Sequence, residues 1–177
     1  MELVILAVIL ILVLIALGLL TNVFFSFLTM SLFGGAYFAG TSRERLKQVF
    51  KLANLKLVDK LLDLGSGDGR IVSAAAQAWV KATGVEINPY YVWLSRQRIK
   101  HLKLTQKAKI VRIDLWQFDT SPYSVVVVYG IGYMMERLKK KLERELKPGS
   151  RIISVYFPIP GWQAVKELGD VKLYIIE

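Results

Sequence analysis

Three glycines alternate with polar residues after an apolar run, and this spacing is the part of the chain best suited to chemistry. The stretch contains, in order, Asp63, Gly65, Ser66, Gly67, Asp68 and Gly69. Alanine-rich residues 71–78 follow it, so the pattern predicts a strand, a tight turn and a helix start. Glycine is needed where the backbone takes positive φ or approaches a ligand, and helix N-terminal N–H groups attract negative groups. The turn therefore predicts a site for a nucleotide-like ligand.

The spacing Gly-x-Gly-x-Gly favours one ligand over another. Dinucleotide sites contain Gly-x-Gly-x-x-Gly and hold a pyrophosphate at the helix N-terminus, and Asp68 would repel that group. S-adenosyl-L-methionine (AdoMet) has no phosphate and carries cationic sulfonium and ammonium groups, which suit Asp63 and Asp68. Glu86 ends the next apolar run, where a carboxylate can accept both ribose hydroxyls. AdoMet is the predicted ligand; the alternative is an ordinary strand-to-helix turn with two solvated acids.

Apolar runs and helical stretches alternate along the rest of the chain, as a doubly wound α/β domain requires. Asn88 and Pro89 provide a helix N-cap and a first helical residue. Residues 110–113 predict a third strand, which ends at Asp114. An acid after this strand commonly accepts from the adenine amino group in AdoMet-dependent enzymes, which implies that role for Asp114; its alternative is an acidic cap beside a core tryptophan. Four consecutive valines within residues 124–129 predict a strand buried on both faces.

Short sequence patterns predict a helix at the start of the folded domain and two strands at its end. Thr41 stands three residues before Glu44, the spacing of a capping box, and predicts a helix over residues 42–54. Its apolar face would consist of Leu46, Val49, Phe50 and Ala53. Residues 164–177 predict two short strands that turn at positions 169–170. The expected fold is α/β, a Rossmann-like seven-stranded sheet with helices on both faces.

Four motifs in this order resemble one family. They are Asp63 to Arg70, Glu86 to Tyr90, Lys141 to Gly149 and Phe157 to Trp162. Together they resemble the small seven-β-strand, AdoMet-dependent protein-lysine methyltransferases. Within these, the chain is similar to the archaeal broad-specificity lysine methyltransferase and to the membrane-anchored mitochondrial lysine methyltransferases of the ATP synthase c-subunit and the adenine nucleotide translocase. The resemblance extends from about Tyr37 to the C-terminus and implies a protein lysine as methyl acceptor.

The resemblance implies roles for further residues. Tyr37 and Thr41 match a tyrosine and a threonine that close over the methionine end of AdoMet in the family. The prolines that the family has beside them are missing in this chain. The alternative for Tyr37 is an aromatic anchor in the membrane interface. Tyr129 stands where the membrane-anchored relatives have an aromatic residue, which implies that it lines the lysine channel; its alternative is a core tyrosine. The Asp/Glu/Asn-x-x-Tyr/Phe motif of many related enzymes is absent. Ile87 and Leu115, each one residue after a predicted cofactor carboxylate, complete the implied cofactor contacts.

The N-terminal region predicts a membrane anchor. No residue from Leu3 to Ser42 is charged, and residues 3–20 are all apolar or glycine. As a helix these residues extend about 27 Å, close to the roughly 30 Å of a bilayer core. A secretory signal peptide is the competing interpretation, but it needs a basic start and a small-residue cleavage site, and Glu2 precedes the apolar run. We therefore expect an anchor in residues 1–40 and a catalytic domain in residues 41–177.

The charges that follow the anchor predict its orientation. Arg43, Arg45 and Lys47 come directly after the uncharged region, so the positive-inside rule places the catalytic domain in the cytoplasm as part of a single-pass protein. Residues 23–38 are also apolar, with interspersed polar residues. They are expected to lengthen the anchor and lie in the membrane interface, with a second span as the alternative.

Composition limits the available chemistry and the partners. The 177 residues contain no cysteine, which excludes disulfides and thiolate metal sites, and the single histidine, His101, lies in a basic helical stretch that predicts a solvated side chain. No metal site is expected. The formal charge of +10 suits an anionic membrane leaflet or an acidic partner. Because the chain has no base-reading motif, nucleic acid is not expected as a partner.

Three hypotheses for function follow from these patterns. The first is a membrane-anchored methyltransferase acting on protein lysines, including those of membrane-embedded proteins. The second keeps the chemistry but transfers the methyl group to a membrane-soluble small molecule such as a quinone or a lipid. The third is a membrane protein that binds AdoMet without catalysis, which the missing acceptor motif would favour.

Overall fold

The computed structural model describes the backbone of residues 1–33 and 42–177, and the side chains of these residues except 2–4 and 26–33. Tyr37 and Thr41 lie outside the described residues. The chain divides into two compact units, Met1–Tyr37 and Phe38–Glu177. The predicted boundary between residues 40 and 41 also falls outside the described part of the chain and stays a prediction.

The first unit is a long apolar helix, α1 (Glu2–Phe33), of 32 residues. Its stretch Ile5–Phe25 has 21 residues, a mean hydropathy of 2.9 and no buried residue, and it is the only candidate membrane span in the part of the chain that is described. At 1.5 Å per residue this stretch is about 31 Å long, close to the thickness of a bilayer core. Residues 23–33 continue the same helix, as expected for an extension of the predicted anchor.

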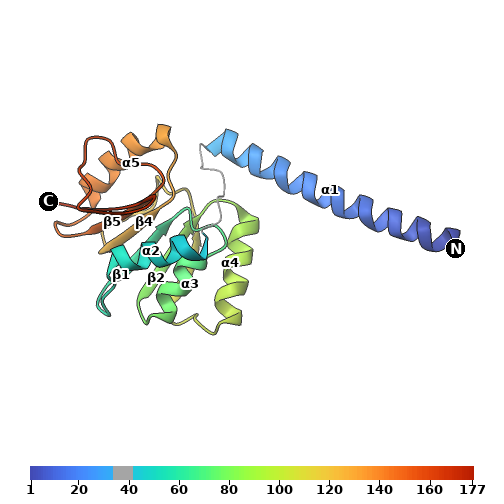
Figure 1. Cartoon of the computed structure of the whole chain (residues 1–177), viewed down its shortest axis with the longest axis horizontal. Coiled ribbons are helices and arrows are strands. Elements are labelled where there is room, and N and C mark those ends of the chain that lie inside the picture. Colours follow the sequence, from blue (N-terminus) through green and yellow to red (C-terminus); the bar gives the residue numbers. More distant parts are fainter. Residues whose placement is uncertain (34–41) are drawn as a thin grey trace. The chain divides into compact units, whose positions relative to one another are not determined.

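The second unit is built on a seven-stranded sheet in the order β3-β2-β1-β4-β5-β7-β6 (Figure 1). Its strands are β1 (Lys60–Leu64), β2 (Lys81–Glu86), β3 (Ala108–Arg112), β4 (Val125–Val128), β5 (Arg151–Val155), β6 (Lys166–Leu168) and β7 (Val171–Ile175). The first five strands are parallel, and β7 is antiparallel to both β5 and β6. The carboxyl ends of β1 to β5 therefore share one edge of the sheet, where ligands bind in open α/β folds.

Helices cover both faces of this sheet. They are α2 (Arg43–Ala53), α3 (Arg70–Gln77), α4 (Pro89–His101) and α5 (Gly132–Glu145). Successive strand residues point to opposite faces, so Val125 and Val127 of β4 pack in the core under α2, α3 and α4, whereas Val126 and Val128 pack in the core under α5. All four valines are at most 1% exposed. The predicted α/β fold, with a central strand buried on both faces, is confirmed.

Helix ends agree with the sequence signals except at α2. Asn88 caps α4 by accepting a hydrogen bond from the Tyr90 N–H at 2.9 Å, as predicted. The N-cap of α2 is Ser42, whose side chain accepts from the Arg45 N–H at 3.2 Å. The predicted capping box of Thr41 and Glu44 was therefore wrong by one residue, because the helix begins at Arg43 and the residue directly before it becomes the cap.

A glycine on β2 lets the glycine turn pack against the sheet. A Cβ atom at Gly84 would lie 2.5 Å from Ser66 Oγ and 2.7 Å from Ile110 Cδ1. We expect Gly84→Ala to displace the turn and lower the free energy of unfolding by about 2 kcal/mol, as overpacking of a core does. Denaturant unfolding of the two proteins measures this difference. Val165→Ala, at a position that is 63% exposed, is the control, and equal stability of Gly84→Ala and the parent chain would contradict the packing.

Candidate active site

The glycine turn joins β1 to α3 and takes a conformation that side chains disfavour. Gly65, Gly67 and Gly69 have φ values of 82°, 49° and 73°, in the left-handed region that glycine adopts readily. The N–H groups of Gly65 and Ser66 both donate to the Val85 carbonyl at 2.9 Å. The turn is therefore fixed to the carboxyl end of β2. Within it, Gly65 is exposed and would have no atom within 4 Å of an added Cβ, so its bare backbone is open at the sheet edge, as the sequence predicts for a nucleotide-like ligand.

Asp63 lies at the base of this turn in the protein interior. It pairs with Gly84 across the parallel strands β1 and β2 and is 2% exposed. Burial, with further contributions from the negative charges of Glu86 and Asp68, raises the pKa of Asp63 from 3.8 to about 8. A carboxyl group in this state gains from a cation beside it, because an opposite charge favours its ionised form. The surroundings of Asp63 thus suit a cationic ligand group.

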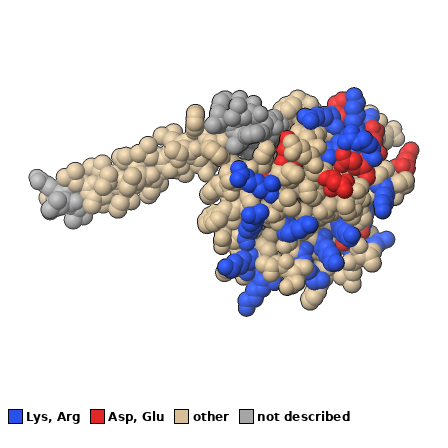
Figure 2. Space-filling model, turned by 180° about the vertical axis from the view of Figure 1, so that it is seen from behind, with Lys and Arg blue, Asp and Glu red and all other residues tan. Residues whose placement is uncertain are grey.

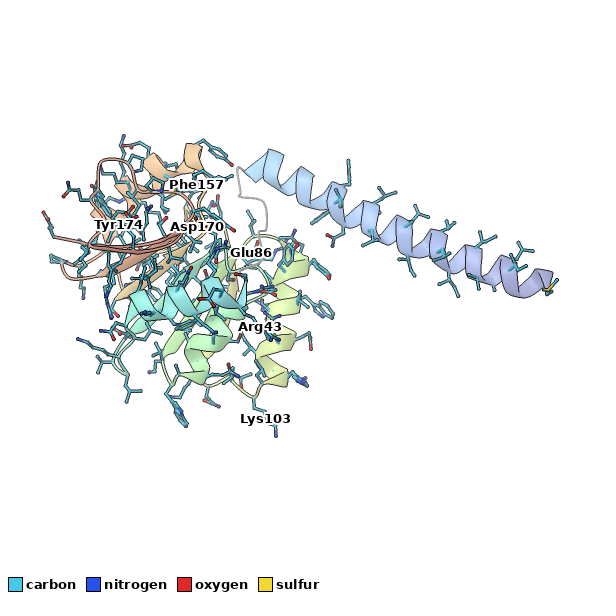
Figure 3. All side chains as sticks on the ribbon, in the orientation of Figure 1. Arg43, Glu86, Lys103, Phe157, Asp170 and Tyr174 are labelled. Atoms are coloured by element: carbon cyan, nitrogen blue, oxygen red, sulfur yellow. The ribbon has the colours of Figure 1, made fainter. Side chains whose placement is uncertain are left out.

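Glu86 ends β2 and is held by backbone N–H groups from three residues. Its Oε1 accepts from Ile87 and Asn88, each at 2.8 Å, and its Oε2 accepts from Gly67 at 2.9 Å. Burial raises the pKa of Glu86, and the three N–H groups oppose that shift. Because a carboxylate has about four acceptor sites, one remains for a hydroxyl donor. Figure 3 shows Glu86 near the N-terminal end of α4.

Asp68 is engaged differently from what the sequence suggested. Its carboxylate forms salt bridges with Arg70 at 2.7 Å and Arg98 of α4 at 3.0 Å. Burial tends to raise the pKa of Asp68, but hydrogen bonds and charges from the two arginines outweigh it and lower the pKa. Arg98 also donates to the Asp68 carbonyl at 2.8 Å. Asp68 therefore fixes the turn to α4, and direct attraction of a ligand cation by this residue stays a prediction.

The turn also contains a buried polar atom that suits a ligand. Ser66 Oγ is buried and has no hydrogen-bond partner among the residues that the structure describes. Together with the bare glycine turn, the buried Asp63 and the remaining acceptor site on Glu86, it matches the donor and acceptor groups of AdoMet. Within residues 1–33 and 42–177, no group of three His, Cys, Asp or Glu side chains is placed to hold a metal ion. The described residues thus fit AdoMet.

The loop after β3 carries two more predicted cofactor residues. Asp114 accepts a hydrogen bond from the Trp116 N–H at 3.0 Å, so its carboxylate stabilises the loop itself. Leu115 is half-buried and packs with Trp116 against the core under α5. The structure places both residues just beyond the carboxyl end of β3, on the same sheet edge as Glu86. Their contact with adenine stays a prediction.

A buried lysine and a half-buried glutamate on α5, which no sequence pattern indicated as a pair, hold this loop. Lys141 Nζ donates to the Phe118 carbonyl at 2.7 Å and pairs with Glu145 at 2.8 Å. Burial tends to raise the pKa of Glu145, but hydrogen bonds from Lys141, Arg144 and Thr120 outweigh it and lower the pKa to about 2. Lysine at position 141 belongs to one of the recognised motifs, yet its spacing alone does not indicate burial.

Aromatic side chains gather where the methyl acceptor is expected. Tyr129, directly after β4, is half-buried and meets Tyr156 edge-on, with ring centroids 6.1 Å apart. Tyr156 follows β5 with a φ of 69°, an uncommon conformation for a bulky residue and a frequent one at functional sites. Arg45 of α2 lies 4.4 Å from the centroid of the Tyr156 ring. No sequence pattern indicated Tyr156 as part of the site, and the role of Tyr129 in the lysine channel stays a prediction.

This topology and site define a class I methyltransferase fold. An RNA methyltransferase from Salinibacter ruber, solved with S-adenosyl-L-homocysteine, superposes with a TM-score of 0.72 and 29% identity, covering 78% of this chain and 92% of that one. The ANTKMT methyltransferase domain family matches residues 63–166. The chain therefore belongs to the ANTKMT methyltransferase domain family, which confirms the resemblance found in its motifs.

Several relatives of this chain bear lysine N-methyltransferase names. The ATP synthase c-subunit lysine N-methyltransferase of Rattus norvegicus is 49% identical over 110 residues, which cover 62% of this chain and 51% of the relative. The protein-lysine N-methyltransferase of Saccharolobus islandicus is 37% identical, covering 69% of this chain and 77% of the relative. The adenine nucleotide translocase lysine N-methyltransferase of Mus musculus is 35% identical, covering 75% of this chain and 58% of the relative. The chain spans about half the length of the mammalian relatives named for ATP synthase.

The buried carboxyl of Asp63 predicts a pH-dependent cost in stability. Because its pKa in the folded chain is raised from 3.8 to about 8, the native state binds more protons than the unfolded state, and its stability falls as the pH rises through this window. Asp63→Asn should therefore raise the melting temperature by several degrees at pH 8 and change it little at pH 4. Thermal unfolding at both pH values tests this, and a variant that melts lower at pH 8 would contradict the burial.

Removing the buried amine of α5 should destabilise the loop after β3. Lys141→Met removes the amine partner of the half-buried Glu145, which keeps its contacts with Arg144 and Thr120. We expect the free energy of unfolding to fall by about 2 kcal/mol, as for loss of a hydrogen bond to a charged group. Lys140→Met is the matched control because Lys140 is exposed, and its effect should stay within about 0.5 kcal/mol. Urea unfolding at neutral pH compares the two variants. Equal destabilisation by both would show that the charge pair does not hold the loop.

Proposed function

We propose that this chain is an AdoMet-dependent protein-lysine N-methyltransferase held at a membrane by α1. The observation that carries the proposal is the glycine turn with the buried Asp63 and the fixed Glu86, within a family whose relatives bear lysine methyltransferase names. A membrane-soluble small molecule is the alternative acceptor, and AdoMet binding without catalysis is the third hypothesis.

The described residues would bind AdoMet through complementary charges and hydrogen bonds. AdoMet supplies an electrophilic methyl group on sulfur. Asp63 would face the cationic methionine end, and the Glu86 carboxylate would accept from a ribose hydroxyl. Asp114 and Leu115 would lie beside the adenine, and Asp68 would keep the turn in shape through Arg98. Tyr37 and Thr41, outside the described residues, would close over the methionine end as the family resemblance implies.

The acceptor side would work mainly by positioning and by excluding water. Transfer of a methyl group to an amine needs alignment of the reacting atoms and a neutral amine, and no covalent intermediate. Aromatic, apolar surroundings disfavour the charged form of a lysine. Tyr129 and its neighbour Tyr156 form such surroundings at the carboxyl ends of β4 and β5. They would orient the lysine amine and help remove its charge.

The membrane part of the proposal rests on α1 and on the charges after it. The stretch Ile5–Phe25 is long and apolar enough to cross a bilayer, and Arg43, Arg45 and Lys47 follow it, which favours a cytoplasmic catalytic domain. Two relatives are named for the ATP synthase c-subunit and for the adenine nucleotide translocase. We propose that the acceptors of this chain are likewise lysines of membrane proteins. A cleaved signal sequence is the competing explanation of α1.

Two observations favour RNA as a further acceptor class. The Salinibacter ruber structure is named an RNA methyltransferase, and this chain has a formal charge of +10. Figure 2 shows Lys and Arg side chains over much of one face of the domain, with Asp and Glu gathered in one part of it. Such a surface attracts any polyanion without reading its sequence. Labelling therefore has to follow RNA as well as protein.

The decisive experiment labels all acceptor classes at once. The full chain, reconstituted in lipid vesicles, is incubated with radiolabelled AdoMet and host protein, lipid and RNA fractions. The proposal predicts base-stable label in protein that maps to lysine, enriched in the membrane fraction. An Asp63→Ala, Glu86→Ala double variant should lose at least about a hundredfold in rate, because two ligand-binding carboxylates are gone. Label only in lipid or RNA, or none despite AdoMet binding, would contradict it.

A further inference from the structure

The sheet edge that carries the site also carries exposed aromatic side chains, which we call the aromatic rim. Its members and their exposed fractions are Tyr90 (46%), Trp93 (56%), Tyr133 (68%), Tyr156 (43%) and Phe157 (38%). They belong to the first two turns of α4, the start of α5 and the segment after β5. Because these segments follow β2, β4 and β5, all five side chains lie around the carboxyl edge of the parallel sheet, beside Glu86 and Tyr129.

Two residues of the aromatic rim, Tyr90 and Trp93, are neighbours on α4. The rings of Tyr90 and Trp93 are 6.3 Å apart, and Tyr90 also meets Tyr91 edge-on at 5.4 Å. Large aromatic side chains exposed together on a domain surface indicate an interaction site. Tyrosine and tryptophan combine an apolar ring with a polar group, which is why they concentrate where a membrane meets water.

The chain enters the domain at the same edge. Arg45, in the first turn of α2, forms a salt bridge with Asp170 at 3.3 Å and lies over the Tyr156 ring. Asp170 stands in the turn before β7, where β7 begins opposite the carboxyl end of β5. The N-cap Ser42 is therefore at the rim. Residues 34–41 connect Phe33, the last residue of α1, with Ser42. The nine Cα–Cα steps between Phe33 and Ser42 limit their separation to about 32 Å at full extension.

The opposite edge of the sheet is a competing docking surface. The loops before β1, β2 and β3 expose Leu57 at 76%, Val58 at 87%, Trp79 at 68% and Leu102 at 38%, among lysines that include Lys103. Figure 3 shows Lys103 beyond the end of α4 that is far from Glu86. The 13 residues of α4 add about 20 Å between the two edges, most of the reach of residues 34–41. Tether length thus favours the rim over the lysine-rich edge.

We propose that the aromatic rim lies in the interface of the bilayer that α1 spans, so that the mouth of the site faces the membrane surface. This inference rests on the proposed function, because it requires α1 to be a membrane anchor. It also narrows the acceptor class to lysines that a membrane protein exposes at the level of the lipid headgroups. Arg43 and Arg112, exposed at the same edge, would face those headgroups.

Quenching of tryptophan by brominated lipids tests which edge meets the membrane. The full chain is reconstituted in phosphatidylcholine and phosphatidylglycerol vesicles whose acyl chains carry bromine close to the headgroup. Trp93 of the rim and Trp79 of the opposite edge are comparably exposed, so Trp93→Phe and Trp79→Phe form a matched pair. The proposal predicts that Trp93→Phe removes at least about half of the bromine-dependent quenching and that Trp79→Phe removes none.

Each other outcome overturns the proposal. Loss of quenching in Trp79→Phe would place the lysine-rich edge on the lipid, and unchanged quenching in both variants would place the domain away from the membrane. Two further measurements on the same samples separate these results from failure of the proposed function. Resistance to alkaline carbonate extraction reports whether α1 is inserted, and binding of S-adenosyl-L-homocysteine reports whether the cofactor site is intact. Quenching is compared in samples whose α1 is inserted and whose cofactor site binds S-adenosyl-L-homocysteine. In such samples, absence of quenching from Trp93 refutes the placement of the aromatic rim in the membrane interface and leaves the proposed function standing.

Discussion

The candidate site is arranged around one unfavourable interaction, the burial of the Asp63 carboxyl group between β1, β2 and the glycine turn. Water is excluded there, and Glu86 and Asp68 add negative charge, so that the pKa of Asp63 rises to about 8. A fold seldom retains such a group without a use, and perturbed carboxyls concentrate at functional sites. A cationic ligand beside Asp63 would offset the electrostatic cost of ionising this buried carboxyl group. We propose that attraction between the ionised Asp63 carboxylate and the ligand cation contributes to the affinity for AdoMet.

Other interactions hold the surroundings of Asp63 in place. Gly84 leaves room for Ser66 beside β2, and the two arginines on Asp68 fix the turn to α4. Three backbone N–H groups fix Glu86. On the other side of the sheet, Lys141 fixes the loop after β3. Each restraint comes from a different element, so the site depends on the packing of the whole domain.

Features that depend on neighbours in sequence could be predicted, and those that depend on distant partners could not. The glycine turn, the Asn88 cap and the buried valines of β4 follow from local spacing and periodicity, and the structure confirms them. Arg98 meets Asp68 across 30 residues and Arg45 meets Asp170 across 125, which no local pattern reveals. The cap of α2 was misplaced because Thr41 and Ser42 are both good caps. Tyr37 and Thr41 lie outside the described residues, and their roles stay predictions.

The most direct test of the central claim is the proton balance of ligand binding. Titration calorimetry of S-adenosyl-L-homocysteine at pH 7, repeated in buffers of different ionisation enthalpy, gives the number of protons exchanged. If the ligand ammonium ionises the buried Asp63, the chain should release about one proton per site, and Asp63→Asn should release none while binding more weakly. Binding without proton release, or equal release by both proteins, would contradict the account.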